Sequence, residues 1–412
     1  MTVELLIDDG IAETRAALFR DGRLDDLWIE RTLAPSLVGN IYAGRVRRVA
    51  PGLGLAFVDI GAEREGVLRA HDARFARGTE PARSPRINAL VAEGDTVAVQ
   101  VAAAAHGDKG PRLTTAIAPT GADDRTADWH AVARGSRVPA LLQAEVAPLE
   151  AALRDLATPD VETIRIGTFA GEARARRYLD RHIARAAGAI ERATPLAVAA
   201  AIDAEIAEAL EPEVALAGGA RLTIETTRAL TAIDVDSGSY AGASNADTAV
   251  AVNLAAAAEI ARQLRIRNIG GTIVVDFINL KDRARAAVAT GALKRALGRD
   301  RMEVRIGAVS RSGLLEMTRR RARPSLTELM FEAIAPRPTA DARAASVLRA
   351  AERAATAHPG KALAILASPA VARVLRAADQ RLLRALGDRV GQPVAIEETA
   401  TAAGDDARVR VG

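Results

Sequence analysis

The chain contains no cysteine, and this absence removes several kinds of chemistry at once. Disulfides, thiolate nucleophiles and zinc sites built on cysteine are all excluded. The five histidines lie far apart, without the spacing of metal ligands, and no serine lies in a nucleophile-elbow motif. The glycines of "GGTIVVDF" are not followed by the Lys-Ser/Thr of a phosphate-binding loop. These chemistries therefore find little support in the sequence.

Long apolar runs are absent as well. None approaches the roughly 18 residues of a membrane-spanning helix, and the opening "MTVELLIDDG" turns acidic within eight residues. We expect a soluble, cytoplasmic protein with no membrane partner. The formal net charge of +4 is small for 412 residues, so any affinity for nucleic acid has to come from a local basic patch.

The pattern of apolar runs predicts an α/β multidomain protein of two to four compact units. Short β-runs between residues 38 and 117 predict a small closed barrel, interrupted by a Pro/Arg-rich loop at 74–86. Residues 220–320 alternate strands and helices around a central sheet, with one long strand over 220–238 and Asn253 as a helix N-cap. From about 340 the tail reads as two Ala-rich helices and a final β-run.

Three aspartates form the candidate catalytic group. Asp234 and Asp236 in "ALTAIDVDSG" project to the same side of a strand, and Asp276 ends the apolar run "GGTIVVD". A right-handed strand–helix–strand connection would make the two strands neighbours. Three carboxylates at one sheet edge repel one another unless a hard cation such as Mg²⁺ neutralises them. Aspartates at strand ends are also common turn-formers, so the spacing alone leaves both interpretations open.

Two basic groups are candidates for binding RNA. The segment 310–326 carries an arginine cluster suited to phosphate contacts, although a solvated helix end would look the same. The predicted barrel mixes aromatic and basic residues, as a stacking platform for single strands requires, although Phe57 could equally belong to the core. The RNA-binding candidates are Phe57, Arg45, Lys109, Arg112, Arg311, Arg319 and Arg320.

Several long motifs, in order, resemble the ribonuclease E/G family. "ALTAIDVDSG", "NLAAAAEIARQLRIRNIGGTIVVDFI" and "SRSGLLEMTRRR" are similar to its catalytic-domain motifs. "GNIYAGRVRRVAPGLGLAFVDIGAEREG" with "DKGPRLTT" resembles its RNA-binding barrel, and "ELLIDDGIAETRAALFRDGRL" its N-terminal segment. The resemblance implies an endoribonuclease that hydrolyses phosphodiester bonds of single-stranded RNA, with Mg²⁺ as cofactor, Mn²⁺ as an alternative and no zinc.

The resemblance also implies a domain order, in which an OB-type barrel is inserted in an RNase H-like subdomain and a DNase I-like catalytic domain follows. The expected segments are the first RNase H-like segment 1–35, the barrel 36–118, a shortened linker and sensor remnant 119–160, the second RNase H-like segment 161–220, the catalytic domain 221–335 and a small C-terminal domain 336–412. By matching positions, Asp234 and Asp276 would hold the metal, and Asp236 would help to position it or its water. Phe57, Lys109 and Arg112 would clamp RNA in the barrel.

Departures from the family pattern shape the expected function. Asp236 replaces the usual asparagine, Val67 the second barrel aromatic, Ser312 a motif phenylalanine and Glu303 a supporting arginine. The resemblance implies that the shortened 119–160 segment has lost the family's Arg-Thr motif that binds a 5′-monophosphate, so we expect cleavage without 5′-end sensing. Without the zinc-linking cysteine pair, a homodimer would need another surface. The alternative is an RNA-binding protein with little or no nuclease activity, for example in ribosomal RNA maturation.

Overall fold

The computed structural model divides the chain into two compact units. The larger unit comprises 1–34, 152–321 and 325–412, and the smaller comprises 35–151 with 322–324. The residues that the structure describes are 2–73, 86–118, 128–183, 190–227, 229–240, 245–279, 282–332, 335–377, 380–391, 393–399 and 407–412. Nearly all of the Pro/Arg-rich segment predicted as a loop, 74–85, lies outside these residues.

The smaller unit is a closed five-stranded barrel, as the closely spaced β-runs predict. Its strands are β4 (Ile41–Ala50), β5 (Leu55–Asp59), β6 (Gly66–Arg69), β7 (Thr96–Ala103) and β8 (Arg112–Thr114). They are ordered β5-β6-β8-β7-β4, and the pairing of β4 with β5 closes the barrel around a buried apolar core.

Part of the predicted linker belongs to the barrel unit. Strand β9 (Ala140–Gln143) pairs with the start of β4, and α2 (Trp129–Arg134) packs on β7 and β4. The cluster that α2 joins contains Ala43, Ala98 and Ala133, whose small side chains allow close approach of the helix to the strands. The described part of 119–160 therefore extends the barrel sheet before α3 (Pro148–Leu156) begins.

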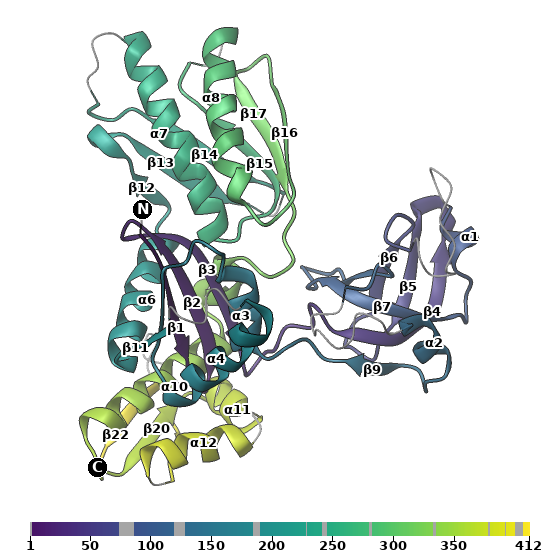
Figure 1. Ribbon diagram of the computed structural model, residues 1–412, viewed down its shortest axis with the longest axis vertical. Coiled ribbons are helices and arrows are strands. Elements are labelled where there is room, and N and C mark those ends of the chain that lie inside the picture. Colours follow the sequence, from purple (N-terminus) through teal and green to yellow (C-terminus); the bar gives the residue numbers. More distant parts are fainter. Residues whose placement is uncertain are drawn as a thin grey trace. The chain divides into compact units, whose positions relative to one another are not determined.

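The first sheet of the larger unit joins distant parts of the sequence (Figure 1). Its strands, in spatial order, are β11 (Ile190–Arg192), β10 (Thr163–Ile166), β1 (Val3–Asp9), β2 (Glu13–Arg20) and β3 (Arg23–Arg31). A tight two-residue turn joins β2 to β3, in which Asp21 and Gly22 both take the positive φ that such a turn requires. The helices α4 (Phe169–His182) and α6 (Pro195–Leu210) follow β10 and β11.

The second sheet carries the candidate catalytic aspartates. In spatial order its strands are β12 (Glu213–Ala215), β13 (Arg221–Thr226), β14 (Thr231–Asp236), β15 (Gly271–Asp276), β17 (Leu314–Arg319) and β16 (Val304–Val309). The long strand predicted over 220–238 is wrong, because β13 ends at Thr226, β14 begins at Thr231, and the two pair with each other as antiparallel strands. Helices α7 (Asn245–Ile266) and α8 (Arg283–Ala296) pack on one face of this sheet, around a core of Ile, Val, Leu and Ala (Figure 1).

The described part of the tail contains three helices and a three-stranded sheet, more than the two helices and one β-run predicted. These elements are α10 (Ala340–Ala357), β20 (Leu363–Ala367), α11 (Pro369–Ala377), α12 (Gln380–Val390), β21 (Ala395–Glu398) and β22 (Ala407–Val411). The remaining short elements are α1 (Ile87–Leu90), α9 (Leu326–Met330), β18 (Phe331–Glu332) and β19 (Ala335–Pro338). No helix in the described ranges is both long and apolar enough to cross a bilayer.

Candidate active site

Asp234 and Asp276 are direct neighbours at the carboxyl ends of two parallel strands. The register of β14 and β15 pairs them with each other, and α7 is the crossover between the strands, as the sequence predicts. Both side chains are exposed, whereas the preceding Ile233 and Val275 are buried under the helices. Strand alternation therefore places the two carboxylates on the sheet face opposite α7 and α8.

This carboxylate pair has the donor chemistry of a magnesium site. Within the described residues, neither Asp234 nor Asp276 makes a hydrogen bond or ion pair that would neutralise its charge. Two adjacent carboxylates repel each other, and a hard divalent cation relieves that repulsion. The described residues contain no group of three Asp, Glu or His placed to hold a metal. A cation held here would complete its coordination with water and substrate oxygens, which is the usual mode of Mg²⁺.

Asp236 differs from the other two aspartates because both of its oxygens are engaged. Its Oδ1 accepts a hydrogen bond from the Gly238 amide at 2.9 Å, and its Oδ2 accepts one from Arg221 Nη2 at 2.7 Å. The Gly238 amide, followed by the Arg221 guanidinium, lowers the pKa of Asp236. The three predicted carboxylates therefore do not form one group. Asp234 and Asp276 lie side by side, whereas Asp236 forms an ion pair with Arg221.

Asn253 positions the chain that follows Asp276, which sequence reasoning missed. It was expected as a helix N-cap, but it lies inside α7 and is buried. Its amide nitrogen donates to the Ile278 carbonyl at 2.8 Å, and its Oδ1 accepts from the Ile278 amide at 3.0 Å. In the sequence, the one sign of this buried contact is a polar residue within the Ala-rich run "AVNLAAAAEI".

The face that carries the carboxylate pair is open and polar over several strands. Its exposed or half-buried members include Thr223 and Glu225 on β13, Thr272 on β15 and Glu316 on β17. Small-molecule sites are typically enclosed and mostly apolar. An open polar sheet face is better suited to an extended polymer than to a small enclosed substrate.

The predicted arginine cluster separates into a buried member and exposed ones. Arg319 is 5% exposed and is held by Asp300, with Nε to Oδ2 at 2.7 Å, and by the Ile269 carbonyl at 2.8 Å. A buried guanidinium engaged in this way does not reach an RNA phosphate, so the structure corrects the role predicted for Arg319. Arg320 is exposed and pairs with Glu303 at 3.1 Å, and Arg311 is exposed in the turn before β17.

Two of the four barrel candidates, Phe57 and Arg112, lie on one row across neighbouring strands. Phe57 pairs with Val67, which in turn pairs with Arg112, so the aromatic ring and the guanidinium share a face. The Arg48 guanidinium lies over the Phe57 ring at 4.2 Å from its centroid, and the ring is half-buried. A second aromatic at the position of Val67 would extend this row, and the valine shortens it.

Two other predicted barrel residues lie away from that row. Lys109 is exposed in a tight turn, where its backbone forms a bridge with His106. Arg45 is half-buried on β4 and donates to the Gly94 carbonyl at 3.1 Å. Both remain candidates for backbone phosphate contacts.

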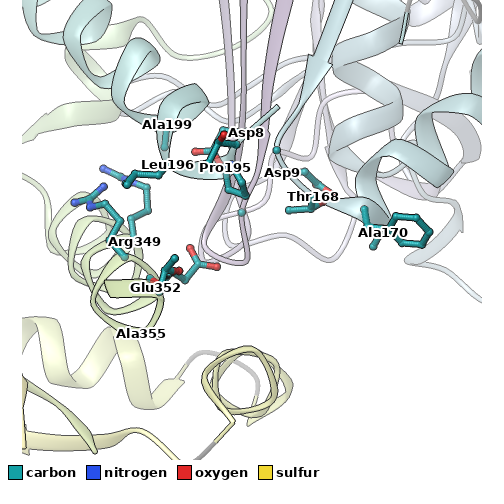
Figure 2. Close-up of a pocket in the computed structure, with 16 residues that line it drawn as sticks. Asp8, Asp9, Thr168, Ala170, Pro195, Leu196, Ala199, Arg349, Glu352 and Ala355 are labelled. Atoms are coloured by element: carbon teal, nitrogen blue, oxygen red, sulfur yellow. Dashed lines mark hydrogen bonds between the residues drawn. The ribbon is translucent and has the colours of Figure 1, made fainter. Parts of the chain in front are cut away.

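A cavity of about 490 Å³ lies elsewhere in the larger unit (Figure 2). It is lined by the ends of β1 and β10 and by α4, α6 and α10. Arg349 on α10 binds Glu13 at 2.5 Å, and Arg353 binds Asp203 at 3.5 Å. Its basic groups therefore tie α10 to the first sheet and to α6, and none of the three candidate catalytic aspartates lines it.

Comparison with known proteins defines the class to which this arrangement belongs. The model of the ribonuclease E/G family matches residues 114–322, a span that includes all three aspartates. Ribonuclease G of Escherichia coli K12 is 29% identical over 477 aligned positions, covering 96% of this chain and 97% of that protein. Ribonuclease G of Haemophilus influenzae is 30% identical, covering 80% of this chain and 82% of that protein. The chain belongs to the ribonuclease E/G family.

Ribonuclease E of Escherichia coli K12 is also similar, with 32% identity over 77% of this chain and 36% of that longer protein. The alignment with the Escherichia coli ribonuclease G has 477 positions, more than the 412 residues of this chain. It therefore contains positions at which the relative has residues that this chain lacks.

Proposed function

We propose that this protein is a Mg²⁺-dependent endoribonuclease that cleaves single-stranded RNA without sensing a 5′-monophosphate. The observation that carries the proposal is the pairing of Asp234 with Asp276 on an open sheet face, with both carboxylates exposed. Membership of the ribonuclease E/G family supports an endoribonuclease role for the site.

In this proposal Asp234 and Asp276 would hold the cation through their carboxylates. When bound there, a divalent cation supplies a water of lowered pKa and neutralises charge on the phosphate. The polar face around the carboxylates receives the RNA backbone, and Arg311 and Arg320 contact its phosphates. Asn253 keeps the chain after Asp276 in place, so the carboxylates are already oriented before RNA arrives.

We propose that the other parts of the chain correspond to the remaining domains expected of the family. We assign the barrel as an OB-type domain that binds a single strand through Phe57, Lys109, Arg112 and Arg45. The sheet of β1–β3 with β10 and β11 corresponds to an RNase H-like subdomain formed by two segments, and β13–β17 to a DNase I-like domain. Residues 336–412 form the small C-terminal domain.

Loss of 5′-end sensing rests on the sequence between the barrel and α3. By the resemblance, the family's phosphate-binding Arg-Thr motif is missing there, and the Arg-Thr dipeptide that the segment does contain, Arg125-Thr126, lies outside the described residues. The described part of the segment contributes α2 and β9 to the barrel unit. In this proposal the shortened segment does not bind a terminal phosphate, and the RNA enters the site directly.

The proposal predicts equal cleavage of two versions of one unstructured RNA, one with a 5′-hydroxyl and one with a 5′-monophosphate. Rates within about twofold, complete dependence on Mg²⁺ and loss of cleavage in chelator are the expected results, because the chemistry needs the cation. Faster cleavage of the monophosphorylated RNA by tenfold or more would show retained end sensing. Absence of cleavage with intact RNA binding would instead support the alternative, an RNA-binding protein without nuclease activity.

A further inference from the structure

Arg221 lies on the same open sheet face as the carboxylate pair, next to it along the strands. It begins β13, and the register pairs it with Asp236 just as Thr223 pairs with Asp234. Two residues of strand separate these two rows by about 6.6 Å. The positively charged guanidinium of Arg221 therefore lies one row away from Asp234 and Asp276, the carboxylates that would bind the metal.

The ion pair with Asp236 orients the Arg221 side chain but uses only part of its hydrogen-bonding capacity. One guanidinium nitrogen, Nη2, donates to Asp236 Oδ2 at 2.7 Å. About half of the Arg221 side chain remains exposed, and a guanidinium carries five N–H donors. Most of its donors thus stay available on the side of the sheet where a substrate would lie.

Stability alone does not account for this pair. Exposed ion pairs contribute little to the free energy of folding, because solvent screens them and both side chains lose rotamer freedom. Asp236 is itself tied at its other oxygen to the Gly238 amide, which makes it a rigid support. A guanidinium held by a rigid carboxylate is well prepared for bidentate contact with a phosphate.

We propose that Arg221 binds an RNA phosphate next to the scissile one, and that Asp236 positions Arg221 and is not a metal ligand. This inference rests on the proposed function, since it adds a substrate-binding residue to the same site. It also explains how the chain accommodates a charged residue where the family usually has asparagine: the added negative charge is matched by the arginine across the strand.

The first test measures binding of an unstructured RNA in chelator, where no cleavage occurs, over a series of salt concentrations. Arg221→Ala is expected to weaken binding about tenfold, as loss of one charge-assisted hydrogen bond predicts. The slope of log affinity against log salt should fall by about 0.7, the value for one phosphate contact on a single strand. Arg221→Lys should recover the slope but only part of the affinity, because an ammonium cannot bind in a bidentate way.

The matched control is Arg410→Ala, which removes an equally exposed arginine that pairs across strands with Glu397 in the C-terminal sheet. It should leave both the affinity and the slope unchanged. An Arg221→Ala variant that is folded, as its thermal unfolding would show, and binds RNA with the wild-type slope would overturn the phosphate contact.

The second test separates positioning from metal binding by titrating Mn²⁺ into the wild-type protein and into Asp236→Asn. Mn²⁺ affinity should change less than about twofold. RNA affinity in chelator should fall toward that of Arg221→Ala, because losing the ion pair that orients Arg221 outweighs the removal of one negative charge from this face. A tenfold loss of Mn²⁺ affinity in Asp236→Asn would make Asp236 a ligand and contradict the inference. Because the RNA-binding measurement needs no catalysis, a wild-type protein that never cleaves RNA would refute the proposed function while Arg221 is still tested.

Discussion

Replacing either Asp234 or Asp276 by asparagine is expected to reduce Mg²⁺-dependent RNA cleavage by at least 10²- to 10³-fold. Each substitution removes one of two charges that hold the cation, and losses of this size follow when a group that stabilises transition-state charge is deleted. RNA binding in chelator should persist or tighten, since a negative charge is removed from the face that receives phosphates. The measurement is single-turnover cleavage of an unstructured RNA at saturating enzyme.

Glu225→Gln is the matched control for these two variants. Glu225 is an exposed acid on the same face, paired with Ala232 one row away from the carboxylate pair. At saturating enzyme its replacement should leave the single-turnover cleavage rate within about twofold of wild type, because Glu225 does not hold the cation and an exposed charge acts on it only weakly through water. Cleavage that survives in Asp234→Asn and Asp276→Asn would remove the carboxylate pair from the mechanism.

Arg319→Ala is expected to destabilise the larger unit by about 3–5 kcal/mol, the range observed when one partner of a buried ion pair is removed. The variant would leave Asp300, whose side chain is 1% exposed, without its cation. The Ile269 carbonyl would lose its donor as well. Chemical unfolding followed by circular dichroism measures this loss.

The neighbouring Arg320 provides the contrast. Arg320→Ala should change the free energy of unfolding by less than about 1 kcal/mol, because its ion pair with Glu303 is exposed. It should weaken RNA binding and lower its salt dependence, whereas the folded Arg319→Ala protein should bind RNA normally. The reverse pattern, with Arg320 needed for stability and Arg319 for RNA affinity, would refute the roles given to them.

The sequence was sufficient to predict the pairing at the centre of the site. Two apolar strands joined by one amphipathic helix leave few topologies, and the right-handed crossover rule makes β14 and β15 parallel neighbours. Aspartates that end both strands then lie at the same sheet edge. The barrel was predictable for a similar reason, since closely spaced β-runs with turn residues favour closure.

Features that depend on register were not predictable in the same way. Arg221 faces Asp236 only because β13 and β14 are two antiparallel strands, and the continuous apolar pattern of 220–238 concealed the break between them. Arg319 follows Leu315 and Met317 on the buried face of β17. Alternation along "LLEMTR" would have indicated its burial, had the segment been interpreted as a strand instead of a helix end.

The contribution of residues 128–143 to the barrel was concealed for another reason. β9 is short and only partly buried, so its apolar content gives a weak strand signal. It exists as a strand because Ile41–Ala43, at the start of β4, do not pair with β5 and so leave an edge with which β9 can pair. Tertiary context of this kind is absent from the local sequence.

Binding of Mn²⁺ to the protein without RNA, followed by electron paramagnetic resonance, tests whether Asp234 and Asp276 hold the metal. We expect one site in the wild-type protein and in Glu225→Gln, and loss of that site in both Asp234→Asn and Asp276→Asn. Retention of wild-type Mn²⁺ binding in both aspartate variants would show that the paired carboxylates of β14 and β15 do not hold the metal.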